Sequence, residues 1–311
     1  MSKQDAYDLV LARIEEALEA GIVPWARPWK SAGPGWAPAV SLATGKPYQG
    51  VNVWTLTATA ALRDYDSRYW ATFKQIQERG GQVRKGEKAT PVVFWKFIEK
   101  KNAETGKDER IPFLRYFQVF NLDQCDGIED PASPIEPEAT FEPIERAQTI
   151  ADRMPGRPSV KHGGDRAFYS PFLDYVQMPH EVQFETSEHY YGTLFHELIH
   201  ATAHESRLDR KNAVGNNFGD ESYSREELIA EMGAAYLCGQ AGIEPNVPHH
   251  AAYIASWLKA LQNDRKMLVV AAGAAQKAAN YILGDTEKPC ESSPVTGSAR
   301  SASLRLTLTL T

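Results

Sequence analysis

The pattern of apolar and polar positions divides the chain into two parts. In the first part, the apolar spacing predicts three helices, at residues 7–20, 52–62 and 72–79. Residues 89–99 and 112–121 are rich in Val, Phe, Tyr and Trp and flank a polar turn, which is typical of a long β-hairpin. The first part is therefore expected to be α+β.

The second part has a different pattern, with a few short strands and then mostly helices. Short strands are expected at residues 159–161, 167–170 and 174–178, separated by glycines and a proline. The helices predicted from the 3.6-residue period are those at residues 143–154, 187–206, 224–240, 250–261 and 264–283. The second part is thus predicted to be mainly helical with a small sheet, and the whole chain to be of the α+β class.

An acidic, proline-rich segment at residues 126–142 has no hydrophobic period and is interpreted as a linker. It separates a predicted first domain, residues 1–125, from a second, residues 143–284. With 311 residues, the chain is long enough for each domain to bury a core of its own. The Ser- and Thr-rich tail, residues 285–311, is expected to be disordered and is assigned no function.

The composition excludes several classes of protein. With 42% hydrophobic and 24% charged residues, the chain is neither collagen-like, nor of low complexity, nor wholly disordered. No apolar run reaches the ~18 residues that span a bilayer, and the N-terminus lacks the apolar core of a signal peptide, so no membrane partner is expected. Cys125, Cys238 and Cys290 are too far apart for a CxxC zinc site or a disulfide framework, which favours a reducing cytoplasm.

The formal net charge of −6 averages two unlike parts. Residues 21–125 carry 16 basic and 9 acidic side chains, a balance of +7, and they hold six of the seven tryptophans. Basic groups that follow a phosphate backbone and aromatic rings that stack bases are the requirements for binding single-stranded DNA. The candidate DNA-contacting residues are Trp25, Arg27, Trp29, Trp70, Lys74, Lys85, Lys88 and Trp95. Each of them also has a structural interpretation, because a tryptophan in a strand usually packs in the core.

The strongest chemical signal is an HExxH motif, with His196 and His200 four residues apart. This spacing places both imidazoles on one face of the predicted helix, where they can bind one Zn²⁺ or another divalent metal. Glu197 lies beside them and is the candidate general base that takes a proton from the attacking water.

A catalytic zinc needs a third protein ligand. His204 is one turn further along the same predicted helix and cannot easily reach the same ion. Glu227 and Glu231 share a face of a later predicted helix, beside small residues that allow two helices to approach closely. This looks like the gluzincin arrangement of HExxH followed by ExxxD, with Glu231 in place of Asp. That likeness implies Glu227 as the third ligand and Glu231 as an orienting residue or fallback ligand, with His204 left to substrate or outer-shell contacts.

A purely structural interpretation of the same residues stands beside this one. His196 and His200 can be buried histidines without a metal. Residues 224–227 can form a capping box, in which Glu227 binds the backbone at the start of its helix. A metal site is favoured because two separate helices supply what zinc requires.

Several further motifs occur in a fixed order: YQGVN at residues 48–52, WATFKQ at 70–75, VRKGEK at 83–88, VFNLDQ at 119–124, the HExxH helix, and YIASWL at 253–258. This order resembles that of the ArdC-like antirestriction proteins of conjugative plasmids over roughly residues 5–284. The resemblance implies an N-terminal domain that binds single-stranded DNA and a C-terminal zincin-like metallopeptidase domain. It also implies protection of incoming plasmid DNA from host restriction, and related N-terminal segments occur in plasmid primases.

Three functions follow from these observations as hypotheses. The favoured one is an antirestriction protein that binds single-stranded DNA and carries a zincin-type metal site. The second is a zinc protease recruited to DNA, whose partner is a protein substrate or a host restriction component. The third is a DNA-binding interaction protein in which the HExxH motif is vestigial.

Overall fold

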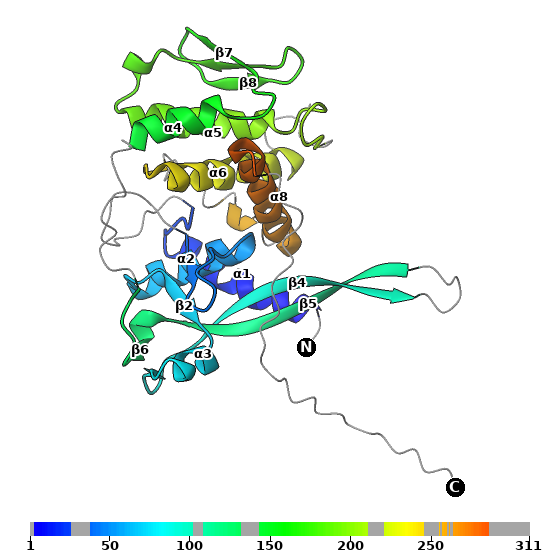
Figure 1. Ribbon diagram of the computed structural model, residues 1–311. Coiled ribbons are helices and arrows are strands. Elements are labelled where there is room, and N and C mark those ends of the chain that lie inside the picture. Colours follow the sequence, from blue (N-terminus) through cyan, green and yellow to red (C-terminus); the bar gives the residue numbers. More distant parts are fainter. Residues whose placement is uncertain are drawn as a thin grey trace.

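The molecule is layered, with a small sheet at one end, helices in the middle and a larger sheet with a long hairpin at the other end (Figure 1). The predicted α+β class is confirmed. The computed structural model describes residues 3–25, 38–101, 108–131, 143–210, 221–245, 255, 257–259, 261 and 264–285. The predicted tail and residues 132–142 of the predicted linker lie outside these residues.

The first domain combines three helices with a four-stranded sheet of order β1-β2-β5-β4. The helices are α1 (Lys3–Glu19), α2 (Val51–Arg63) and α3 (Phe73–Glu78). The strands of this sheet are β1 (Val40–Ser41), β2 (Tyr69–Ala71), β4 (Thr90–Lys101) and β5 (Asp108–Asn121). A second, two-stranded sheet joins β3 (Gln82–Val83) to β6 (Cys125–Asp126), after the short 3-10 helix η1 (Leu122–Gln124).

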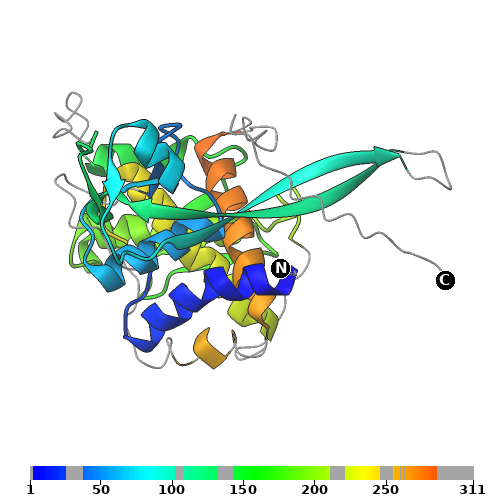
Figure 2. The ribbon, with the colours of Figure 1, turned by 90° about the horizontal axis from the view of Figure 1, so that it is seen from below.

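The predicted hairpin is formed by β4 and β5, which pair antiparallel from Thr90 opposite Val119 out to Lys101 opposite Asp108. It projects from the body of the molecule (Figure 2). At its base the outer edge of β4 is closed by a side chain of α2. The Asn52 amide donates to the Val93 carbonyl at 2.6 Å and accepts from the Val93 N–H at 2.8 Å, so it replaces a neighbouring strand at that point.

Helix α2 is buried along its first ten residues, because α1, β4 and α8 all pack against it. Two of its buried hydroxyls donate to carbonyls one turn earlier, Thr55 to Val51 at 3.0 Å and Thr59 to Thr55 at 2.9 Å. Helix α1 contributes Val10, Leu11 and Ile14 to the core. Leu9 is 41% exposed and lies outside this buried face.

The second domain places a three-stranded sheet over a group of helices. Its sheet has the order β7-β9-β8, and the 3-10 helix η2 follows it. The elements are α4 (Pro143–Asp152), β7 (Ser159–His162), β8 (Phe168–Ser170), β9 (Tyr175–Met178), η2 (Glu181–Gln183), α5 (Ser187–Ala201), α6 (Glu221–Ala241) and α8 (Arg265–Leu283). The predicted helix at 250–261 lies mostly outside the described residues.

Helix α5 ends at Ala201, five residues before the predicted end. The Thr202 hydroxyl donates to the Ile199 carbonyl at 2.6 Å, and the chain then folds back on the helix end. The Leu208 N–H bonds the Thr202 carbonyl, and the Arg210 N–H bonds the Ala203 carbonyl. This turn brings Arg210 back beside the helix, where it contributes to the site described below.

The buried apolar residues of the two domains form one continuous hydrophobic core. Trp25 of the first domain packs edge-on against Trp54 at 6.3 Å and against Trp257 of the second domain at 5.1 Å. Trp54 in turn packs against Tyr236 of α6 at 5.4 Å, and the Tyr236 hydroxyl lies 3.4 Å from the Tyr48 carbonyl. The domain boundary in the sequence is therefore not a boundary in the packing.

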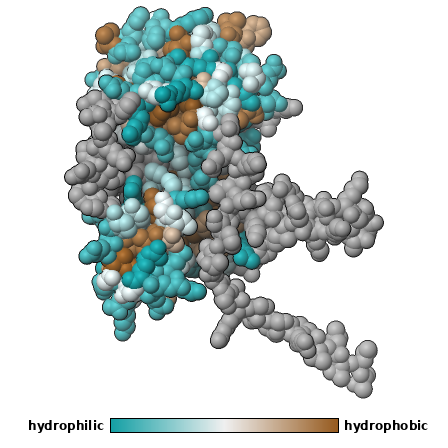
Figure 3. Space-filling model, in the orientation of Figure 1, coloured by the Kyte–Doolittle hydropathy of each residue, from teal (hydrophilic) through white to brown (hydrophobic). Residues whose placement is uncertain are grey.

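Within the described residues, none of the helices combines the length and the apolar character needed to cross a membrane. Apolar side chains do reach the surface over the small sheet of the second domain (Figure 3). The most exposed of them are Phe172 at 93%, Val182 at 92% and Leu173 at 63%.

Candidate metal centre

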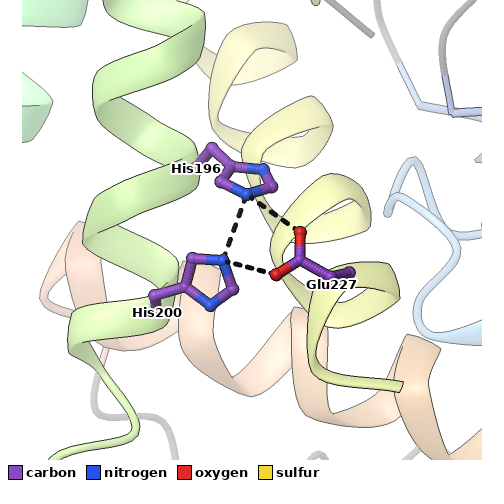
Figure 4. Close-up of side chains that lie close together, drawn as sticks. All are labelled: His196, His200 and Glu227. Carbon is purple, nitrogen blue, oxygen red and sulfur yellow. Dashed lines mark hydrogen bonds and ion pairs between the residues drawn. The ribbon is translucent and has the colours of Figure 1, made fainter. Parts of the chain in front are cut away.

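The HExxH motif lies in the last turns of α5. The helix begins where the Thr186 side chain accepts a hydrogen bond from the His189 N–H, a regular N-cap. Phe195, Leu198 and Ile199 are fully buried on the side of α5 that faces the core. The 3.6-residue period then directs His196 and His200 together toward α6 (Figure 4).

Helix α6 supplies the opposite wall and crosses α5 closely. Gly233 makes this approach possible, because a Cβ atom built on it would lie only 2.6 Å from Cδ1 of Ile199. Helix α6 begins at Glu221, so Ser224 is not a cap residue and the capping-box interpretation of residues 224–227 is wrong. The Glu227 carboxylate instead faces the two histidines (Figure 4).

The three side chains form a compact set of donor atoms. Nε2 of His196 lies 3.1 Å from Nε2 of His200. The two oxygens of Glu227 lie 3.6 Å from Nε2 of His196 and 3.5 Å from Nε2 of His200. Ligand atoms about 2.1 Å from a tetrahedral ion are about 3.4 Å from one another. The distances therefore fit one divalent metal ion bound by His196, His200 and Glu227, and within the described residues this is the group that fits.

Two more glutamates of α6 face the other ring nitrogens of the histidines. An oxygen of Glu231 lies 3.9 Å from Nδ1 of His196, and an oxygen of Glu226 lies 3.6 Å from Nδ1 of His200. Carboxylates in this position fix the orientation of a ligand imidazole and make it a better donor. Glu231 thus occupies the orienting place that the sequence suggested for it, and Glu227 the place of the third ligand.

Glu226 was not singled out from the sequence, and neither was its partner Arg210. The Arg210 guanidinium donates to the Glu226 carboxylate at 2.5 Å and to the Ile199 carbonyl at 2.9 Å, so it joins α6 to the end of α5. Only the return of the chain after α5 brings Arg210 to this position. The sequence carries no local signal for the contact between Arg210 and Glu226. The position of Glu226 next to the candidate ligand Glu227 is the one reason to have considered Glu226.

The carboxylates make the site strongly favourable for positive charge. Burial by itself lowers the pKa of His196, but Glu227, Glu231 and Glu197 outweigh it and raise the pKa to about 9. Burial raises the pKa of Glu231. Burial also acts to raise the pKa of Glu226, but hydrogen bonds from His200 and Arg210 reverse the effect and lower it. A site that stabilises a protonated imidazole in this way also stabilises a bound cation.

Glu197 and His204 are the other two residues predicted to belong to the site. Glu197 is 8% exposed and lies close enough to His196 to raise the pKa of that imidazole. His204 turns away from the three ligands, and its Nδ1 lies 2.8 Å from the Ser206 hydroxyl. The possibility that His204 is the third ligand is therefore dropped.

The predicted DNA-contacting residues that the structure describes differ in exposure. Trp25 and Trp70 are 1% and 0% exposed, so neither ring offers a face to a base, and both are withdrawn as DNA contacts. They are buried because their rings pack with Trp257 and with Tyr65, respectively. The basic candidates that lie at the surface are Lys74, Lys85 and Lys88. Arg27 and Trp29 lie outside the described residues, and of Trp95 the structure describes only the backbone, within β4.

Comparison with known proteins agrees with both halves of this architecture. Residues 4–120 match the N-terminal domain of the anti-restriction factor ArdC, and residues 146–274 match a zincin-like metallopeptidase. The metal-free crystal structure of antirestriction protein ArdC from plasmid R388 has a TM-score of 0.72 and 38% identity, over 90% of this chain and 97% of that chain. The chain belongs to the ArdC family. The Mn(II)-bound structure of the R388 ArdC protein is similar as well, with a TM-score of 0.71 and 36% identity.

Curated relatives extend the comparison beyond ArdC itself. DNA primase TraC of Escherichia coli is 38% identical over 306 residues, which are 92% of this chain but 28% of TraC. A second TraC primase of Escherichia coli is matched over 20% of its length, so the chain spans about a quarter or less of these primases. Protein y4eC of Sinorhizobium fredii (strain NBRC 101917 / NGR234) is 37% identical over 286 residues, 89% of this chain and 91% of y4eC.

Proposed function

We propose that this ArdC-family chain binds single-stranded DNA and protects DNA that enters a cell by conjugation from host restriction. The observation that carries this proposal is the similarity to antirestriction protein ArdC of plasmid R388, which includes 97% of that chain at 38% identity. The balance of +7 over residues 21–125 supports a nucleic-acid partner for the first domain.

Conjugation into a restricting host tests this function. An unmodified plasmid is transferred to a restricting and to a non-restricting recipient, with and without the chain expressed in the recipient. We expect the chain to raise the recovery of the plasmid in the restricting recipient and to leave recovery in the other recipient unchanged. Equal losses with and without the chain would exclude protection.

We also propose that the metal in the cell is zinc, because two imidazoles and one carboxylate are a ligand set of catalytic zinc sites. The Mn(II)-bound relative makes manganese the main alternative. A bound divalent metal of this kind polarises a carbonyl group and acidifies water. His196, His200 and Glu227 would hold the metal. Glu231 and Glu226 face the Nδ1 side of the two rings and would fix their orientation.

Peptide hydrolysis is a second candidate function, favoured by Glu197 at the edge of the metal centre. Glu197 would take a proton from the attacking water and pass it to the leaving amine, with a host restriction component as a possible class of substrate. Glu197→Gln keeps the size and the hydrogen-bonding atoms of the side chain but not the base. If Glu197→Gln binds metal and still protects DNA as well as the wild type, proteolysis is not the means of protection.

A further inference from the structure

One side of β5 carries exposed side chains next to α3. Side chains alternate between the two faces of a strand, and on β5 Val119 and Asn121, which point to the other side, are 2% and 0% exposed. The alternate positions, Tyr116 and Gln118, are exposed, and Phe120 is half-buried. β5 is a central strand of this sheet, with β2 beside its end and β4 along its length. Ala71 beside Phe120 and Val93 beside Tyr116 are buried, so the open face is the row of side chains on β5 itself.

Two large aromatic rings stand on this face. Tyr116 is 44% exposed on β5, and Phe73, the first residue of α3, is 49% exposed. The Phe73 ring lies 6.4 Å from the Phe120 ring in an edge-to-face arrangement, so the open face and the start of α3 form one continuous surface. Figure 2, seen from below, shows the hairpin crossing in front of the helices. We name Phe73, Tyr116 and Phe120 the aromatic face.

A basic side chain lies at the Phe73 end of the aromatic face. Lys74 follows Phe73, and its side chain is 64% exposed. Lys74 is 3.5 Å from Glu78, but an exposed ion pair of this kind stabilises a protein little and can be exchanged for a phosphate. The surface therefore combines exposed rings with nearby positive charge.

We propose that single-stranded DNA binds across the aromatic face, with bases stacked on Phe73 and Tyr116 and a phosphate near Lys74. This inference rests on the proposed binding of single-stranded DNA and assigns it to a surface. Aromatic side chains on the open face of a four-stranded sheet stack unpaired bases in other nucleic-acid-binding folds, and every base has a ring face, so such binding tolerates any sequence. The aromatic face replaces Trp25 and Trp70, whose rings are buried.

The test uses the full chain, since the first domain shares its core with the second. The probe is a fluorescein-labelled oligothymidylate of about 20 nucleotides, longer than the ~4–16 nucleotides that one such site covers. We expect Phe73→Ala and Tyr116→Ala each to weaken binding roughly 5- to 100-fold. Phe172→Ala is the matched control, because Phe172 is 93% exposed on the other domain, and it should bind as the wild type does.

The salt dependence separates stacking from charge. Lys74→Gln should reduce the slope of log K against log salt by about 0.7, the value for one phosphate contact on a single strand. Phe73→Ala and Tyr116→Ala should leave this slope unchanged while they lower the affinity. A duplex of the same length should compete weakly, because its bases are already stacked.

Photo-cross-linking of the wild type to a halogenated oligothymidylate gives a second measurement that needs no variant. Cross-linked peptides that contain Phe73 or Tyr116 would support the assignment. The assignment is overturned if the wild type binds and both alanine variants bind equally well, or if cross-links fall on other surfaces, and DNA binding itself then stands. If the wild type binds no single-stranded DNA, the proposed function fails together with the site.

Discussion

Gly233→Ala is the substitution that most clearly tests how the metal centre is built. The added methyl group would lie 2.6 Å from Cδ1 and 2.9 Å from Cγ1 of Ile199, where ordinary contacts begin at 3.4 Å. Ile199 is fully buried and cannot swing out, so α5 and α6 must separate by a distance of the order of the missing ~0.8 Å. Overpacking of this size typically costs about 1–3 kcal/mol of the free energy of unfolding.

The same separation should disturb the metal centre, because His200 is the next residue after Ile199 and Glu227 lies on the opposite helix. We expect Gly233→Ala to lower the melting temperature by several degrees and to weaken the binding of Zn²⁺ or Mn²⁺, measured by thermal denaturation and chelator competition. Gly273→Ala is the matched control in α8, where an added Cβ meets nothing within 4 Å and should stabilise the helix by roughly 0.5–1 kcal/mol. Unchanged stability and metal affinity in Gly233→Ala would refute the reasoning.

Three further predictions follow from the contacts described. Glu226→Gln removes the negative charge that faces His200. We expect the metal affinity to fall roughly 10-fold or more in a chelator competition assay. An unchanged affinity would mean that Glu226 does not orient His200. A hydrogen bond from Arg207 lowers the pKa of Asp174 below its usual 3.8, so its contribution to stability is present above about pH 4 and is lost as the pH falls through the lowered value. Thermal melts between pH 6 and 3 should therefore show a larger drop for the wild type than for Asp174→Asn, and parallel curves would contradict this. Asn52→Asp keeps the acceptor for β4 but loses the amide donor at a buried position, and we expect a loss of about 1–3 kcal/mol in chemical denaturation.

The pairing of His196 with His200 could be predicted from the sequence because the helix period decides which side chains share a face. Glu227 was chosen through the likeness to the gluzincin arrangement, and small residues on α6 indicated a close helix pair. Arg210 could not be predicted in the same way. Its place beside Glu226 depends on the turn that follows α5, which is determined by tertiary contacts of the backbone.

The residues proposed to contact DNA could not be predicted from the sequence in the same way. Composition identified a basic, tryptophan-rich domain, but composition does not distinguish a ring in the core from a ring at the surface. Trp25 and Trp70 are buried, whereas Phe73 and Tyr116 are exposed. Their exposure depends on which face of the sheet the helices cover, and the alternation along β5 does not by itself reveal that face.

The shared core was also beyond the reach of the sequence. Length and an acidic, proline-rich segment indicated two independent domains. Trp25, Trp54, Tyr236 and Trp257 instead pack into one cluster that crosses the boundary. Local patterns describe each helix well, but they contain no information about which apolar faces meet across a long separation in the chain.

His196, His200 and Glu227 define the proposed metal centre, and Glu227 is the ligand that distinguishes it from a site built on Glu231. This ligand set is tested by the metal content per chain, measured by inductively coupled plasma mass spectrometry after dialysis. The wild type is compared with variants of two glutamates of α6, Glu227→Ala and Glu231→Gln. We expect about one divalent metal per chain in the wild type, a loss of metal in Glu227→Ala, and metal retained with weaker affinity in Glu231→Gln. Full metal content in Glu227→Ala together with loss in Glu231→Gln would contradict the assignment and make Glu231 the ligand.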